Sequence, residues 1–193
     1  ATAKRLGAVN VATDIRPEAL EQARSLRAKI LDTGVPPEIA MGEGGYARAL
    51  PDEWLERERE AIRETVAQSD IVILSALVPG RIAPVLITPE MVQSMRPGSV
   101  IVDIAIDQGG NCALTEPGKT VVKHGVTIIG AKNIPGYAPR SATWLFAHNL
   151  YHFISYLVEE GRVRTQRDDE IIGPTLVTID GELVHAGALD AIG

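Results

Sequence analysis

Two continuous apolar runs constrain the fold of this chain most strongly. They are Asp70-Ile-Val-Ile-Leu-Ser-Ala76 and Ser99-Val-Ile-Val-Asp-Ile-Ala105. Runs of this length without alternation are typical of strands that are buried on both faces of a parallel sheet. Because such a sheet needs helices on both faces, the two runs predict an α/β fold.

Helical patterns alternate with the predicted strands. Leu20, Ala23 and Leu26 mark an amphipathic helix over 17–30, and a second, densely charged helix is expected over 51–68. Thr88 and Pro89 are suited to begin a short helix over 88–95. Two short strands are expected at 119–122 and 126–129. The alternation predicts a doubly wound parallel sheet.

The segment 32–50 is rich in proline and glycine and is predicted to be a long irregular loop, a kind of segment that is often functional. A change of character follows Pro139. A helix over 141–160 carries apolar residues on more than one side, and alternation around Asp180-Gly181 predicts a hairpin. We therefore expect one domain over 1–140, and over 141–193 a C-terminal helix and hairpin that belong to a second, incomplete domain. Unless a partner covers it, the apolar surface of the helix should cause dimerisation or aggregation.

Composition excludes several functions. The 193 residues carry 19 basic and 25 acidic side chains without a basic cluster, so nucleic acid is not an expected partner. The single cysteine, Cys112, rules out an internal disulfide and a cysteine-based metal site. His148 and His152 have metal-binding spacing but no third ligand, so we expect no metal. The sequence has no apolar run of the roughly 18 residues that a membrane helix needs.

Asp14 ends another apolar run, 8–13, and has no glycine-rich turn in front of it. In a Rossmann dinucleotide site, a strand, a Gly-x-Gly-x-x-Gly turn and a helix precede an acid that lies about 20 residues on and binds the adenosine ribose. Asp14 stands where that acid is expected, and residues 1–7 resemble the end of the helix. The prediction is a Rossmann-like sheet that lacks its first strand and glycine turn. The alternative is a simple turn acid before Pro17.

In open parallel sheets, ligands bind beyond the carboxyl ends of the strands. Asp14 and the segments 76–80, 103–112 and 132–136 are expected to face one crevice there. Asp14 would accept hydrogen bonds from ribose hydroxyls and repel a 2′-phosphate, which favours NAD over NADP. Asp107 with Gln108 follows a buried strand, where charged groups usually need a partner or a ligand. Asn133 is suited to donate an amide hydrogen bond. The alternatives are a solvated loop acid at Asp107 and a local turn contact at Asn133.

Several segments together resemble a known family. They are Gly44-Gly45-Tyr46-Ala47, Ser75-Ala76-Leu77-Val78-Pro79-Gly80, Ala83-Pro84-Val85-Leu86-Ile87-Thr88, Gly98-Ser99-Val100-Ile101-Val102-Asp103, Asp107-Gln-Gly-Gly-Asn-Cys112, Glu116-Pro117-Gly118 and Asn133-Ile-Pro-Gly136. They are similar to the NAD(H)-binding domain I, in the alpha subunit, of proton-translocating NAD(P) transhydrogenase. The resemblance covers nearly the whole chain. Alanine dehydrogenase shares 103–110, whereas Asn111-Cys112 with 116–118 and the 44–46 loop resemble the transhydrogenase.

The resemblance implies NAD as cofactor and no catalytic side chain. Asp14 would hold the adenosine ribose, Gly45 would approach the cofactor at the base of a mobile loop, and Tyr46 would close that loop. Glu58 and Leu77 would line the adenosine side, although Glu58 alone reads as one charge on a solvated helix face. The predicted cofactor-binding residues are Asp14, Gly45, Tyr46, Glu58, Ala76, Leu77, Asp107, Gln108 and Asn133.

The implied activity is hydride transfer from NADH to NADP bound on a separate domain, coupled to proton movement through a membrane domain. The resemblance further implies NADP-binding and membrane partner subunits, a homodimer, and a cytoplasmic location peripheral to the inner membrane. The chain resembles a fragment that binds the cofactor weakly or not at all by itself. The alternatives are an alanine dehydrogenase-like enzyme, with Asp107 and Asn133 in its active site, and a non-catalytic interaction module.

Overall fold

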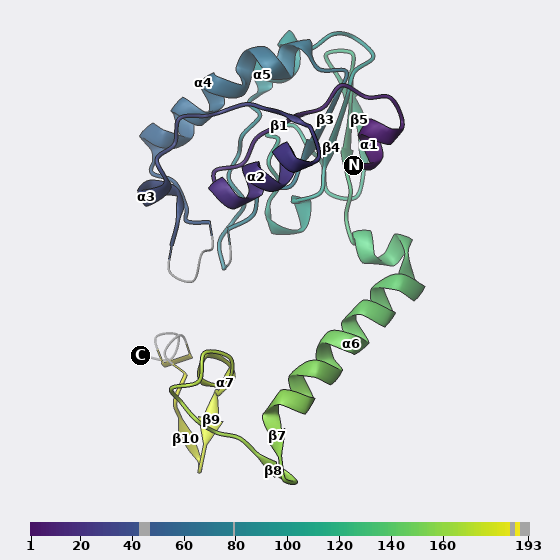
Figure 1. The fold of residues 1–193 in the computed structure, drawn as a ribbon. Helices are drawn as coiled ribbons and strands as arrows, with labels where there is room; N and C mark the ends of the chain where they lie inside the picture. The colour runs from purple at the N-terminus through teal and green to yellow at the C-terminus, as the bar shows by residue number, and fades with distance from the viewer. Residues whose placement is uncertain (43–46, 79, 186–187, 190–193) are drawn as a thin grey trace. The chain divides into compact units, whose positions relative to one another are not determined.

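The computed structural model describes residues 1–42, 47–78, 80–185 and 188–189 (Figure 1). The chain separates into two compact units, Ala1–Ile134 and Pro135–Gly193. The predicted domain boundary at residue 140 falls in the first turn of a helix of the second unit. In the described residues, no helix combines the length and apolarity needed to cross a bilayer.

A four-stranded sheet forms the centre of the first unit. Its strands are β3 (Ile71–Leu74), β4 (Val100–Asp103), β6 (Val126–Gly130) and β5 (Thr120–Lys123), in the order β3-β4-β6-β5. β3, β4 and β6 are parallel, with Ile71 opposite Val100 and Val100 opposite Thr127, whereas β5 is antiparallel to β6. The two apolar runs thus form adjacent parallel strands, as predicted.

Helices α4 (Asp52–Gln68) and α5 (Pro89–Ser94) cover one face of this sheet (Figure 1). Ile62 and Val66 of α4 and Met91 of α5 pack with Ile101 and Ile128 of the strands in one buried core. The Thr88 hydroxyl accepts a hydrogen bond from the Met91 amide at 3.4 Å, which confirms the predicted helix start. On the other face, Ile71 and Ile73 of β3 are 64% and 66% exposed. In the described part of the chain, the expected helix cover is therefore present on one face of β3.

A small βαβ unit precedes the main sheet. β1 (Val11–Ala12) and β2 (Lys29–Ile30) pair in parallel, and α2 (Pro17–Ser25) connects them. The predicted helix over 17–30 is therefore too long. It ends early because Arg27 adopts a positive φ of 61°, which a right-handed helix does not allow. Strand β2 was missed because two residues are too few to show a strand period.

Short helices occur where the sequence gives weak signals. α1 (Thr2–Arg5) is followed by Gly7 at a φ of 91°, in agreement with the predicted helix end. The segment expected to be irregular contains α3 (Pro37–Ala40) and a bridge between Met41 and Ala47. The 3-10 helices η2 (Ile106–Gln108) and η3 (Ile134–Tyr137) follow β4 and β6.

The second unit consists of one long helix and two hairpins. α6 (Pro139–Leu157) leads into the hairpin of β7 (Val158–Glu159) and β8 (Arg162–Val163). α7 (Ile172–Thr175) precedes the hairpin of β9 (Thr178–Ile179) and β10 (Glu182–Leu183). Both hairpins turn through two residues with positive φ, at 160–161 and 180–181, as type I′ turns require. The second hairpin was predicted and the first was not.

Helix α6 is apolar but exposed. None of its 19 residues, all of which lie in the described part of the chain, is buried. Trp144, Phe146 and Tyr151 are 59%, 69% and 66% exposed. His148 contacts its own helix, with Nδ1 2.8 Å from the Trp144 carbonyl oxygen. No group of three metal-ligating side chains occurs in the described residues.

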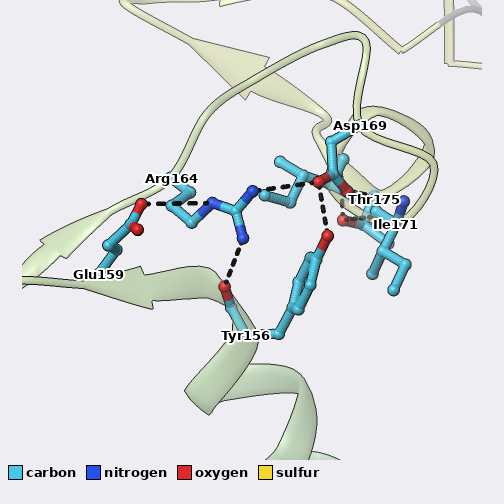
Figure 2. Close-up of polar contacts among 7 residues, drawn as sticks. Tyr156, Glu159, Arg164, Asp169, Ile171 and Thr175 are labelled. Atoms are coloured by element: carbon cyan, nitrogen blue, oxygen red, sulfur yellow. Dashed lines mark hydrogen bonds and ion pairs between the residues drawn. The ribbon is translucent and has the colours of Figure 1, made fainter.

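A polar cluster joins the end of α6 to the segment after β8 (Figure 2). The Asp169 carboxylate accepts hydrogen bonds from the Tyr156 hydroxyl at 2.6 Å and from Nη2 of Arg164 at 3.2 Å. It also accepts from the amides of Ile171 and Ile172, both at 2.9 Å. The Tyr156 hydroxyl and these amides hold the pKa of Asp169 below its usual value. The cluster fixes the chain between β8 and α7.

Candidate functional site: the strand-end loops

Parallel strands place their carboxyl ends at one edge of the sheet, and here the loops that follow β3 and β4 are bonded to each other. The amide of Ala83 donates to the Gln108 carbonyl at 2.7 Å. The amides of Leu86 and Ile87 donate to the Asn111 carbonyl at 2.8 and 2.9 Å. The two loops therefore form one platform at the edge where ligands bind to open α/β sheets.

Asp103, the last residue of β4, is the buried anchor of this platform. Its side chain is fully buried and accepts hydrogen bonds from the amides of Ala105 at 3.1 Å, Asn111 at 2.9 Å and Cys112 at 3.0 Å. Gly110 permits this turn with a φ of 85°, and a Cβ there would lie 2.8 Å from an Asp103 carboxylate oxygen. The glycine is thus required by both backbone conformation and space.

Asn111 connects the two loops through its side chain. It is fully buried, and its Nδ2 donates to the carbonyls of Ala76 at 2.9 Å and Pro84 at 2.7 Å. Its Oδ1 accepts from the Ala76 amide at 2.8 Å. The predicted site residue Ala76 is therefore held by both of its backbone polar groups.

Other predicted residues lie on the solvent side of the platform. Leu77 is 41% exposed, and the side chains of Asp107 and Gln108 are exposed. Asp107 is not a purely solvated acid, because its Oδ2 accepts from the backbone amide of Asn133 at 3.0 Å. The structure thus brings Asp107 and Asn133 together, each following a neighbouring parallel strand.

Asp14 lies just beyond β1 and is held by Arg16. The Arg16 amide and Nε donate to Oδ1 at 2.9 and 3.0 Å, and Nη2 donates to Oδ2 at 3.0 Å. These bonds and the charge of Asp14 raise the pKa of Arg16. Sequence reasoning missed Arg16, although the Asp-x-Arg spacing carried the signal. A ligand that binds Asp14 must share this carboxylate with the guanidinium.

An open pocket of about 360 Å³ adjoins this ion pair. It is lined by Arg16, Glu18, Ala19, Gln22 and Met41. Its polar rim and partly apolar floor are of a kind that accommodates small molecules.

Glu58 is not a solvated helix residue. It is 7% exposed, on the face of α4 that also buries Ile62 and Val66. Burial and the negative charge of Asp14 raise the pKa of Glu58 to about 7, while Arg59 opposes the shift. This buried carboxyl therefore lies within electrostatic range of Asp14, as the resemblance implied for two residues of one site. The predicted residues Gly45 and Tyr46 lie outside the described residues.

Comparison with known proteins agrees with this architecture. The family model described as "Alanine dehydrogenase/PNT, C-terminal domain" matches residues 1–186. The chain belongs to this family. The match confirms the resemblance found in the sequence.

Individual members of the family are also similar to the chain. The first portion of NAD(P) transhydrogenase subunit alpha of Rhodospirillum rubrum, a separate polypeptide, is 46% identical over 188 residues, which are 96% of this chain and 49% of that protein. A crystal structure of transhydrogenase from Sinorhizobium meliloti matches with a TM-score of 0.73 and 40% identity, covering 95% of this chain and 47% of that one. Alanine dehydrogenase of Staphylococcus saprophyticus is 38% identical over 136 residues, 68% of this chain and 37% of that protein.

The chain spans about half the length of the curated relatives that it matches. The Rossmann-like α/β class predicted from the apolar runs is confirmed by the structural neighbours of the family. Sequence reasoning did not assign Asp103 and Asn111 a role in the platform. An acid at the end of a buried run, followed by two glycines and an asparagine, was the available signal.

Proposed function

We propose that this chain forms the NAD(H)-binding part of a proton-translocating NAD(P) transhydrogenase, an oxidoreductase that transfers hydride between NADH and NADP⁺ held on a separate domain. The observation that carries the proposal is the extent of the match. Similarity to the transhydrogenase subunit runs over 96% of the chain, whereas similarity to alanine dehydrogenase covers 68%.

The geometry of the first unit supports a cofactor site. The buried carboxyl of Glu58 makes no hydrogen bond to a described residue, and Asp14 offers a partly exposed carboxylate nearby. We assign Asp14 to the adenosine ribose, Glu58 and Leu77 to the adenosine side, and the platform with Ala76, Asp107, Gln108 and Asn133 to the rest of the cofactor. The bound cofactor supplies the hydride. The side chains position it, and none acts as acid or base in the transfer.

The proposal extends to partners. The names of the relatives denote a subunit, which supports assembly with NADP-binding and membrane subunits. This places the chain on the cytoplasmic side of the inner membrane, held there by its partners. The exposed apolar residues of α6 support a homodimer. Sedimentation of the full-length protein as a compact monomer would contradict the dimer.

The test is calorimetric titration of the full-length protein with NADH and, separately, with NADPH. NADH should bind selectively, because Asp14 repels a 2′-phosphate. Substitution Asp14→Asn removes charge-assisted hydrogen bonds, each worth about 1.5 to 3 kcal/mol, so the Kd for NADH should rise roughly 10- to 150-fold.

The matched control is Asp70→Asn, since the Asp70 side chain is 85% exposed and remote from the strand ends that form the site. Its Kd should equal that of the unsubstituted protein. Unchanged NADH affinity in Asp14→Asn would refute the assignment of Asp14. The 193-residue chain by itself is expected to bind NADH weakly, and tight binding by it would refute that expectation.

An alanine dehydrogenase-like function is the second candidate, supported by the 38% identity to that enzyme. The two enzymes are separated by assay of the full-length protein. Alanine-dependent reduction of NAD⁺ would favour the dehydrogenase, and hydride transfer between NADH and NADP⁺ with the partner subunits would favour the transhydrogenase.

A further inference from the structure

Glu58 differs from the other acids of α4. Glu53, Glu56 and Glu60 are 61% to 70% exposed and form ion pairs with Arg57, Arg59 and Arg63 of the same helix. Glu58 lies four and eight residues before Ile62 and Val66, so the helical period that buries those side chains also buries its carboxyl.

The cations near Glu58 are engaged elsewhere. Arg59 donates from Nε and Nη2 to the Val85 carbonyl at 2.9 and 2.7 Å, and from Nη1 to Glu56 at 3.0 Å. Arg16 is paired with Asp14. In the part of the chain that the structure describes, the Glu58 carboxyl receives no hydrogen bond and forms no ion pair. The charged groups that act on it are Asp14, from the segment after β1, and Arg59, on its own helix.

Two protonation states of Glu58 would meet the cofactor differently. An ionised Glu58 would add a second negative charge beside Asp14, in a buried position, against a ligand that itself carries two phosphate charges. A neutral carboxylic acid removes this repulsion and supplies an O–H donor that Asp14, as a carboxylate, lacks. The two acids would then complement a nucleoside with both an acceptor and a donor.

We propose that Glu58 binds the adenosine side of NAD(H) as a neutral acid, donating its O–H hydrogen bond while Asp14 accepts, so that NADH binding takes up a proton from solvent near neutral pH. The inference rests on the proposed function of the site. It adds to that function a proton linkage located on one side chain, separate from the hydride step. The raised pKa of Glu58, about 7, agrees with this linkage.

The linkage is measured by calorimetric titration of the full-length protein with NADH in buffers of different ionisation heat, from pH 6 to 8.5. The Kd should rise with pH, with a limit of tenfold per pH unit above the pKa of Glu58. Proton uptake should approach about one per NADH at the alkaline end. Glu58→Gln keeps a neutral group with an N–H donor, so proton uptake and the pH dependence of Kd should both disappear.

The matched control is Glu60→Gln, two residues along the same helix and exposed. It should retain the proton uptake and the pH dependence. A second readout needs no cofactor. Carbon-13 NMR of the Glu58 carboxyl in the ligand-free protein should show titration near pH 7, whereas a midpoint near the ordinary value of about 4.3 would overturn the inference.

The outcomes also separate this inference from the proposed function. NADH binding without proton uptake, or proton uptake that survives in Glu58→Gln, overturns the linkage and leaves the cofactor site intact. A folded protein that binds no NADH at any pH overturns the proposed function, and the linkage with it.

Discussion

Helices α4 and α6 differ in a way that their compositions do not suggest. α4 is dense in charged residues, yet it buries Glu58, Ile62 and Val66 against the parallel sheet. α6 is largely apolar, yet it buries no residue in the described chain. The difference teaches that burial depends on whether a complementary surface is present, not on how apolar a helix is.

The two helices also differ in how their surroundings are fixed. The sheet under α4 ends in loops tied together by the buried side chains of Asp103 and Asn111. α6 contributes Tyr156 to a polar cluster at its last turn, and its apolar residues further back face solvent. The comparison therefore predicts large effects of substitutions at the packed end of the sheet and small ones along α6.

The largest expected effect is at Asp103. Asp103→Ala leaves three backbone amides without their acceptor, and each unpaired buried group costs about 1 to 3 kcal/mol. The free energy of unfolding should fall by roughly 3 kcal/mol or more, as measured by urea denaturation. Asp103→Asn keeps one acceptor oxygen and should recover part of the loss if the alanine variant does not fold. A loss below about 0.5 kcal/mol in Asp103→Ala, like that expected for exposed Asp70→Ala, would contradict the anchor role.

A matched pair of isoleucines tests the comparison directly. Ile62 on α4 is 6% exposed and Ile154 on α6 is 49% exposed. Ile62→Ala should lower the free energy of unfolding by about 2 to 5 kcal/mol, because it opens a cavity in the core. Ile154→Ala should change it by less than about 0.5 kcal/mol. An equal loss in both variants would break the comparison, since it would show that α6 is covered in solution.

The smallest effect is expected on the exposed face of α4. Arg57 pairs with Glu53 at 2.6 Å and lies 4.5 Å from the centre of the Trp54 ring. Arg57→Ala should cost less than about 1 kcal/mol, because exposed helix pairs and cation–π contacts are each weak. Thermal denaturation at low and high salt measures the electrostatic part. A loss as large as that in Ile62→Ala would mean that the charged face of α4 is not a solvated surface.

The local parts of the fold were predictable from sequence. The apolar runs predicted β3 and β4 because burial on both faces leaves no polar alternation, and Thr88 marked the start of α5 through its capping side chain. Strand β2 was missed because it has two residues and depends on its partner β1. Local pattern gives out where pairing is decided by distant segments.

The candidate site divides in the same way. Asp14 was found because its place after an apolar run is a local feature. The contact between Asp107 and the Asn133 amide joins residues 26 positions apart, and the bonds of Asn111 to Ala76 span 35. Glu58 looked solvated because its neighbours in sequence are charged, whereas its burial follows from its helical register with Ile62 and Val66. Neither distance nor register against a sheet is written in a short stretch of sequence.

The hydrogen bonds of Asp103 and Asn111 have a consequence for the thermodynamics of ligand capture. Because these bonds hold the loops after β3 and β4 in the folded chain, the loops have already lost their conformational freedom before a ligand arrives. A ligand that binds this platform incurs little further ordering entropy there, and preorganisation of this kind raises affinity without any additional contact. The same amides should exchange their hydrogens with solvent only when the sheet itself opens.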